Sequence, residues 1–216
     1  MEPLIFIIFI VTFIGSVILH EIAHGFVAYK FGDDTAKISG RLSLNPIVHI
    51  DPVGSILVPL MLYVSSAGFL FGWAKPVPVN PLRLNNQPLS YRLVSAAGVV
   101  TNLVLAIVSA IVIKITTQYL GIGFNNVGVI FFSSMMQINI VLAIFNMLPL
   151  PGFDGWNFLG TFRPIAILMN QTPLANPIFM AQYGLVISIA LLFILMPVIS
   201  LLFNYIFGLF ITIFGL

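Results

Sequence analysis

The sequence predicts an all-α integral membrane protein, a polytopic helical bundle, and three observations support this fold class. Of the 216 residues, 60% are hydrophobic and only 6% are charged, against about 25% charged in soluble domains. Several apolar stretches reach the roughly 20 residues that a membrane-spanning helix needs. Eight basic and six acidic residues are too few to coat a globule of this size. This composition excludes a soluble enzyme, and the 20 Phe exclude a disordered chain.

Charge and cysteine content exclude further classes of function. The net charge is only +2 and no dense basic cluster occurs, so no nucleic-acid partner is expected. Because the chain contains no Cys, it has no disulfide, no thiolate nucleophile and no thiolate metal ligand. Any metal site must therefore use His, Asp or Glu.

Five apolar stretches define the expected elements in chain order. They are Leu4–Tyr29, Val53–Phe71, Leu93–Tyr119, Val127–Met147 and Tyr183–Leu216. The first has no basic start, so it is expected to be a retained helix rather than a signal peptide. The last is too long for one straight span, and Pro197 is expected to kink or divide it, which leaves open whether it crosses once or twice. We expect a single domain over residues 1–216, with a core at about 4–160 and a C-terminal helical segment at 178–216.

The stretch Val53–Phe71 is expected to be re-entrant, returning to the face from which it starts. Pro59 and the sequence Ser65-Ser66-Ala67-Gly68 interrupt it. A full crossing would also place the basic loops before and after it on opposite faces, which the positive-inside rule disfavours. With a re-entrant segment, seven of the eight basic residues face the cytosol and Lys114 lies at the far end of its helix. A short strand at the cytosolic face is expected at Ala36–Leu44, where apolar and polar residues partly alternate.

The first helix contains the pattern His20-Glu21-Ile22-Ala23-His24. Two His at positions i and i+4 lie one turn apart, so both imidazoles can face one ion. Glu21 lies beside them and can take a proton from a metal-bound water, as in the H-E-x-x-H pattern of metal hydrolases. Chance is a weak explanation here, because the chain has three His in all and ionisable groups in a membrane helix are costly.

A catalytic zinc usually takes three protein ligands. The candidates for the third are His49, Asp33, Asp34, Asp51 and Asp154. Asp154 is favoured because an apolar helix ends shortly before it, in a turn rich in Pro and Gly. Two full crossings between His24 and Asp154 also return the chain to the same face. The alternative is that Asp154 merely caps a helix in a polar loop.

These motifs together resemble the site-2 protease family of intramembrane zinc metalloproteases. The resemblance is found in His20-Glu21-x-x-His24, Asn146-x-x-Pro149-x-Pro151-x-x-Asp154-Gly155, Ala97-Gly98-x-x-x-Asn102 and the connection Gly72–Pro81. It covers roughly residues 15–160 and is typical of small bacterial members. The sequence differs from larger relatives because it has no helix before the H-E-x-x-H helix and no room for a PDZ-like or CBS module. Val99 also stands where the family usually has Pro.

The resemblance implies a zinc-dependent endopeptidase that cleaves peptide bonds within or beside transmembrane segments. It implies that His20, His24 and Asp154 bind one Zn²⁺ per chain and that Glu21 is the catalytic acid and base. The expected partners are a membrane-spanning protein substrate and the lipid bilayer, with self-association left open. The expected location is a prokaryotic cell membrane, crossed several times, with the active site near the cytosolic face.

Four further residues are weaker candidates. Asn102 and Asn146 can hold an unwound substrate or stabilise an oxyanion, although amides between membrane helices are as often structural. His49 and Asp51 lie two residues apart in a Pro-flanked loop that they are expected to anchor by hydrogen bonds, and the alternative is a gating or ligand-orienting role. Two rival functions remain at this point: a catalytically inactive membrane scaffold of the same fold, and a zinc carrier.

Overall fold

The computed structural model describes residues 3–64 and 72–216. Its regular structure consists of α-helices joined by short 3₁₀ and π turns. The α-helices are α1 (Pro3–Lys30), α2 (Thr35–Ile38), α3 (Val58–Val64), α4 (Leu89–Lys114), α5 (Val127–Asn146), α6 (Asp154–Gly160), α7 (Arg163–Asn170) and α8 (Pro177–Phe214). The short turns are η1 (Pro46–His49), η2 (Pro52–Leu57), η3 (Pro81–Arg83), η4 (Ile115–Tyr119) and η5 (Pro173–Ala175).

Four helices in the described part of the chain are long and apolar enough to cross a membrane. These candidate spans are Pro3–Lys30, Leu89–Tyr119, Val127–Asn146 and Val186–Phe214. They coincide with four of the five apolar stretches in the sequence. The prediction of a helical, multi-pass membrane protein is therefore confirmed.

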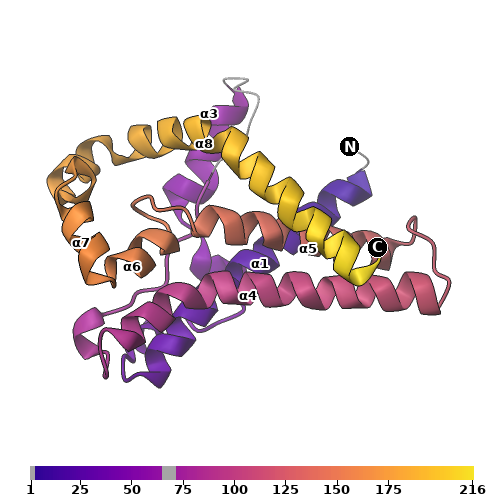
Figure 1. The fold of residues 1–216 in the computed structure, drawn as a ribbon, viewed down its shortest axis with the longest axis horizontal. Helices are drawn as coiled ribbons and strands as arrows, with labels where there is room; N and C mark the ends of the chain where they lie inside the picture. The colour runs from indigo at the N-terminus through magenta and orange to yellow at the C-terminus, as the bar shows by residue number, and fades with distance from the viewer. Residues whose placement is uncertain (1–2, 65–71) are drawn as a thin grey trace.

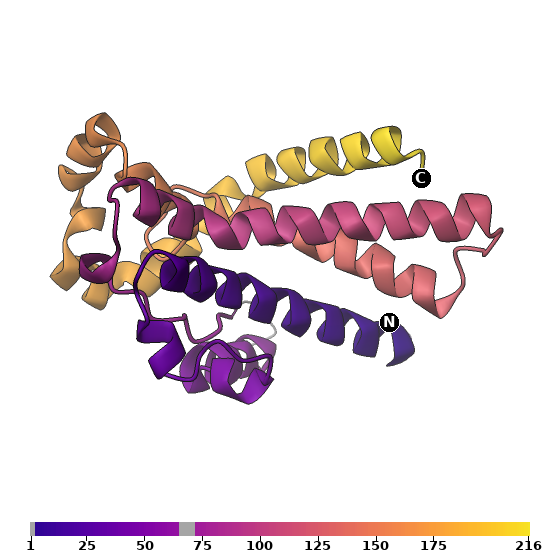
Figure 2. The ribbon, with the colours of Figure 1, turned by 90° about the horizontal axis from the view of Figure 1, so that it is seen from below.

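The main core lies between α4, α5 and α8. Ala106, Ala110 and Ile113 of α4 are buried against Met136 and Ile140 of α5. The small alanines let the two helix backbones approach closely, as is usual between membrane helices. Figure 2 shows α1 running along the side of α4, with the short elements α2 and α3 on the far side of α1.

The C-terminal helix α8 is continuous over 38 residues, with Pro197 inside it. It changes direction part-way along its length (Figure 1). A proline removes one backbone hydrogen bond and its ring displaces the preceding turn, so a bend is expected there. Of the two alternatives in the sequence, a kink is observed and a division is not.

The predicted strand at Ala36–Leu44 is wrong. Residues Thr35–Ile38 form one helical turn, and no strand occurs within residues 3–64 or 72–216. The N–H of Arg41 donates to the carbonyl of Ala36 at 2.9 Å, and Gly40 has a φ of 66°. The N–H groups from Ile38 to Arg41 all donate to carbonyls within residues 34–37, so they form a turn rather than a ladder with another segment.

The segment Val53–Phe71 is described only in part, since residues 65–71 lie outside the described residues. Its first half forms η2 and α3. The start of the segment lies beside Trp73, which follows it in the sequence: the N–H of Trp73 donates to the carbonyl of Gly54 at 3.2 Å, and Ser55 Oγ donates to the carbonyl of Trp73 at 2.8 Å. A Cβ on Gly54 would overlap the Trp73 indole, at 2.3 Å, so this close approach depends on glycine.

The direction of the long helices places the end of α5 near the second half of α1. In Figure 1, α4 runs from left to right and α5 returns, so that α6 and α7 lie at the end where α4 begins. The start of α1 and the C-terminus lie toward the opposite end. Two antiparallel spans thus bring the residues after Asn146 back to the His-bearing part of α1.

Candidate metal centre

His20 and His24 lie one turn apart on α1 with their side chains on the same face. Their ring centroids are 4.8 Å apart and the ring planes meet at 78°. The two Nε2 atoms are 3.1 Å apart. The i and i+4 spacing therefore directs both nitrogens to one point, as the sequence predicts.

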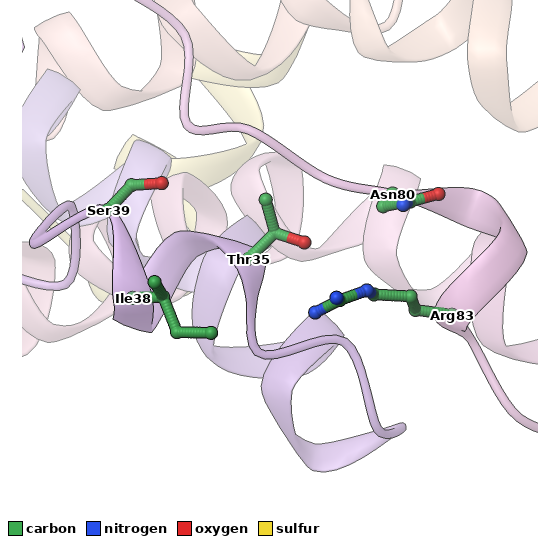
Figure 3. A pocket seen from close by; sticks show the side chains of 5 residues that line it. All are labelled: Thr35, Ile38, Ser39, Asn80 and Arg83. Carbon is green, nitrogen blue, oxygen red and sulfur yellow. The ribbon is translucent and has the colours of Figure 1, made fainter.

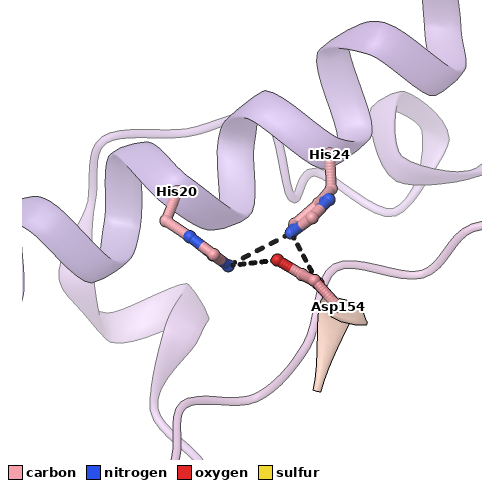
Figure 4. A group of neighbouring side chains, drawn as sticks. All are labelled: His20, His24 and Asp154. Atoms are coloured by element: carbon pink, nitrogen blue, oxygen red, sulfur yellow. Dashed lines mark hydrogen bonds and ion pairs between the residues drawn. The ribbon is translucent and has the colours of Figure 1, made fainter. Parts of the chain in front are cut away.

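Asp154 is the first residue of α6, and its carboxylate faces both imidazoles (Figure 4). Oδ2 lies 3.2 Å from His20 Nε2, and Oδ1 lies 3.2 Å from His24 Nε2. The side chains of His20, His24 and Asp154 are 7%, 11% and 15% exposed, respectively. A residue far along the chain thus completes a largely enclosed cluster.

The turn before α6 brings Asp154 into this position. Leu148 and Leu150 are buried in the main core, which fixes the chain just after α5. Gly152 has a φ of 93°, in the left-handed region that favours glycine. A Cβ on Gly155 would lie 2.3 Å from the carbonyl oxygen of Met147, so only glycine allows the start of α6 to pack against this turn.

Each imidazole is fixed through its other nitrogen by a residue of α4. His20 Nδ1 is 2.6 Å from Oδ1 of Asn102, and His24 Nδ1 is 2.7 Å from the carbonyl oxygen of Val94. Both partners are oxygens that accept, so each Nδ1 carries the proton. Each Nε2 is then left with its lone pair toward the cluster, as a metal ligand requires.

Gly98 leaves room for the two rings between α1 and α4. A Cβ at this position would lie 2.3 Å from His20 Cε1 and 2.5 Å from Nε2 of both His20 and His24. The backbone of α4 therefore forms one wall of the site, against the edges of the rings.

The cluster fits a zinc ion. His20, His24 and Asp154 each offer a ligand atom, and these atoms lie within 4.8 Å of one another. With both Nε2 atoms unprotonated, no N–H of the cluster satisfies the buried Asp154 Oδ2, and this oxygen makes no hydrogen bond. Three acceptors that face one point need a cation between them. Ligands at about 2.0–2.1 Å in a tetrahedron are about 3.3 Å apart, close to the 3.1–3.2 Å observed.

Glu21 lies beside His20 but does not share its partners. Its Oε2 accepts a hydrogen bond from the N–H of Val77 at 2.7 Å. Pro76 and Pro78 have no N–H, so Val77 provides the backbone donor of this three-residue stretch. Arg41 donates to the carbonyls of Lys75 and Pro76, which helps to hold the stretch against α1.

The structure separates His49 and Asp51 from the cluster. His49 is buried and its Nε2 donates to the carbonyl of Ser43 at 2.8 Å. Asp51 accepts from the N–H groups of Val53 and Gly54 at 3.0 and 2.6 Å and caps η2. Both contacts fit the expected loop anchor, and neither residue orients a ligand of the cluster.

The remaining candidates also have distinct surroundings. Asn146 donates from Nδ2 to the carbonyl of Leu142 in its own helix at 3.0 Å, and its role toward substrate stays a prediction. Asp33 accepts from Thr35 and from the N–H of Asn80 at 2.6 Å, while Asp34 pairs with Arg83. Neither carboxylate belongs to the cluster, so the choice of Asp154 over them agrees with the geometry.

A hollow of about 270 Å³ lies at the surface beside α2. It is lined by Thr35, Ile38, Ser39, Asn80 and Arg83. Figure 3 shows the Arg83 side chain extending along it toward Thr35. None of its lining residues belongs to the metal cluster, and the charge of Arg83 is already paired with Asp34.

Sequence reasoning missed two residues behind the site, Asn139 and Ser16. Both are fully buried, and Asn139 bonds to Asn102 as well as to Ser16. The available signal was a pair of amides, Gln137 and Asn139, in the middle of the apolar stretch Val127–Met147. The register that aims Asn139 at α4 could not be read from the sequence.

Comparison with known proteins identifies related sequences. The chain is 40% identical over 185 residues to the "Putative zinc metalloprotease YwhC" of Bacillus subtilis, covering 84% of this chain and 78% of the relative. It is 28% identical to "Putative zinc metalloprotease Rip2" of Mycolicibacterium smegmatis, over 87% of this chain and 67% of that protein. For Rip2 of Mycobacterium tuberculosis the identity is 32%, over 70% of this chain and 56% of the relative.

No protein-family model matches the chain, and no solved structure is similar to it. The family assignment therefore rests on the sequence relatives, and the His20, His24 and Asp154 cluster agrees with it. With 40% identity to YwhC over most of both sequences, the chain belongs to this zinc metalloprotease family.

Proposed function

We propose that this protein is a zinc-dependent endopeptidase of the site-2 protease type, which cleaves membrane protein substrates within or beside their transmembrane segments. The observation that supports it most directly is the enclosed donor set of His20, His24 and Asp154 at the end of a membrane helix. Soluble metalloproteases meet their substrates in water. Here the ligands lie on spans and beside them, so the natural substrate is another membrane-embedded chain.

The residues of the site have separate tasks in this proposal. His20, His24 and Asp154 bind zinc, which when bound activates water and polarises the scissile carbonyl. Glu21 takes the proton of the attacking water and delivers it to the leaving amine. Because Oε2 accepts from the N–H of Val77, Oε1 is the oxygen that receives the proton. In this proposal Asn146, at the end of α5, binds the unwound substrate or the oxyanion.

The segment Val53–Phe71 is proposed to be a hairpin that returns to its starting face. The hydrogen bonds of Gly54 and Ser55 with Trp73 support this, because they hold the start of the segment beside a residue that follows it in the sequence. This leaves Lys30, Lys75 and Arg92 at the same end of the bundle as the metal centre. The positive-inside rule then favours a cytosolic position for that end, with Lys114 at the other.

The test uses purified protein in lipid vesicles with fluorophore–quencher peptides that span the bilayer. One peptide carries Gly and Pro within its span and the other is all Leu, because a substrate helix must unwind before hydrolysis. We expect zinc-dependent cleavage of the first peptide. Glu21→Gln should keep its zinc and lose cleavage by about 10²–10⁴-fold, whereas Asp34→Asn, an exposed acid, should change neither.

The rival functions give different results in the same assay. A scaffold cleaves neither peptide and is insensitive to Glu21→Gln. A zinc carrier moves zinc into the vesicles without cleavage. Either result would contradict the proposed protease.

A further inference from the structure

Three buried side chains link His20 of α1 to α4, then to α5 and back to α1. His20 Nδ1 bonds to Asn102 Oδ1 at 2.6 Å, and Asn102 Nδ2 donates to Asn139 Oδ1 at 2.7 Å. Asn139 Nδ2 donates to Ser16 Oγ and to the carbonyl of Met135, both at 2.8 Å. Asn102, Asn139 and Ser16 are 0% exposed, so no water competes for these bonds. This series of hydrogen bonds joins α4, α5 and α1 at the level of the metal centre.

The carbonyl of Met135, at the last step of this series, determines the direction of every hydrogen bond before it. The Met135 carbonyl can only accept, so Asn139 must turn its NH₂ group toward it. Asn139 Oδ1 then faces Asn102 and orients the Asn102 NH₂ group toward itself. Asn102 Oδ1 is consequently directed at His20, where it can only accept. His20 Nδ1 must therefore be the protonated nitrogen, and Nε2 keeps its lone pair for the metal.

We infer that Asn139 is a positioning residue of the metal centre, which fixes the orientation of the Asn102 amide and through it the tautomer of His20. This inference rests on the proposed zinc site. Without an acceptor at position 139, the Asn102 amide is free to rotate by half a turn. Its NH₂ group then faces His20 Nδ1 and favours the tautomer with the proton on Nε2, which cannot bind zinc.

The imidazoles of His20 and His24 differ in what fixes their tautomers. His24 Nδ1 faces the carbonyl of Val94 directly, and a backbone carbonyl cannot rotate. The tautomer of His20 instead depends on side chains. Hence the inference predicts that metal affinity is sensitive to a residue that touches neither the metal ligands nor the substrate.

The experiment measures zinc affinity of the full-length protein in detergent by competition with a chromophoric chelator. Asn139→Leu removes the acceptor for Asn102. It should weaken zinc binding by about 10–100-fold, the usual cost of losing a group that orients a metal ligand. Asn139→Asp keeps the shape of the side chain at position 139. In this buried position the carboxyl group is neutral, so it still accepts from Asn102 and donates onward. The zinc affinity of the Asn139→Asp variant should lie within about threefold of the wild-type value.

A double variant separates orientation from packing. In Asn102→Asp the new carboxyl group faces the Nδ1–H of His20, a donor that favours the ionised form, unlike a carboxyl group at position 139. The carboxylate has only acceptor oxygens, so no rotation can present a donor to His20. If Asn139 acts by orienting Asn102, then adding Asn139→Leu to Asn102→Asp should change zinc affinity little. The two substitutions are then strongly non-additive. A role in helix packing alone predicts the same loss in both backgrounds.

Controls make each outcome decisive. Ser109→Ala removes a buried hydroxyl of α4, which among the described residues donates to the carbonyl of Leu105 in its own helix, and should leave zinc affinity unchanged. Thermal unfolding shows that each variant is folded, and Asn139→Ala replaces Asn139→Leu if the latter does not fold. Equal zinc affinity of wild type and Asn139→Leu, or equal weakness of the Asp and Leu variants, would overturn the inference. Failure of the wild type to bind zinc would instead contradict the proposed function.

Discussion

The backbone of Gly98 touches the ring of His20: a Cβ built on Gly98 would lie only 2.3 Å from His20 Cε1. Helix α4 thus approaches α1 as closely as a glycine permits at the level of the metal ligands. One residue of α4 sets the space for both rings, since the same Cβ would lie 2.5 Å from His24 Nε2.

Gly98→Ala should therefore impair zinc binding. The added methyl group forces the rings or the helices apart, and a tight overlap in a packed interior costs about 1–3 kcal/mol or more. We expect less than half of the wild-type zinc content after dialysis, measured by elemental analysis. Gly15→Ala, on α1 with no atom within 4 Å of the new Cβ, is the matched control. Equal zinc content in wild type and Gly98→Ala would contradict the closeness of α4 to the site.

The Val77 N–H should matter for turnover rather than for zinc. Val77→Pro removes the donor to Glu21 Oε2, so the carboxylate loses its fixed orientation. We expect kcat to fall by about 10-fold or more with zinc content retained. Val79→Pro introduces the same ring two residues along without removing this donor, and should have a smaller effect. A fall in zinc content with kcat per bound zinc unchanged would show that the contact has another role.

Replacing Asn102 by Ala should mainly weaken zinc binding, whereas replacing Asn146 by Ala should mainly lower kcat. Asn102 supports His20, so its loss should weaken zinc binding by about 10–100-fold. Asn146 bonds only within its own helix in the described contacts, so its loss should lower kcat and leave zinc affinity unchanged. Chelator competition and peptide cleavage on the same two preparations check both expectations. Loss of zinc from Asn146→Ala would show that Asn146 supports the metal ligands instead.

The stabilising contribution of the Asp33 carboxylate should be lost in acid. Burial acts to raise the pKa of this carboxyl, but hydrogen bonds from Thr35 and Asn80 outweigh it, so the pKa is lowered. The carboxylate therefore contributes stability above the unfolded-state pKa of about 3.9, and this contribution is lost as the pH falls through the lower folded-state value. Asp33→Asn should lower the Tm at pH 7, and the difference from wild type should shrink toward pH 3. A difference that stays constant with pH would contradict this assignment.

Much of the site was predictable because its information is local or topological. His20 and His24 share a helical face by their spacing alone. Asp154 was predictable because two crossings return the chain to its starting face, which needs the count of full crossings with Val53–Phe71 interpreted as a segment that does not cross. The part played by Asn102 was not, because the sequence places an amide on a helix but does not tell which side chain it faces.

The errors have a physical cause as well. The alternation in Ala36–Leu44 resembles a strand, yet Gly40 and the hydrogen bond from Arg41 to Ala36 close it into a turn. A strand needs a partner, and periodicity cannot show whether one is present. Asn139 was missed for a similar reason, since its importance lies in contacts between helices that are remote in sequence.

The central claim is that His20, His24 and Asp154 hold one zinc ion, and zinc content per chain tests it most directly. Purified wild type and Asp154→Ala are compared by elemental analysis after dialysis against zinc-free buffer. The structure predicts about one zinc per wild-type chain and clear loss in the variant, because the carboxylate supplies the ligand opposite both imidazoles. Wild-type protein without zinc even after reloading, or full zinc content in Asp154→Ala, would contradict this metal centre.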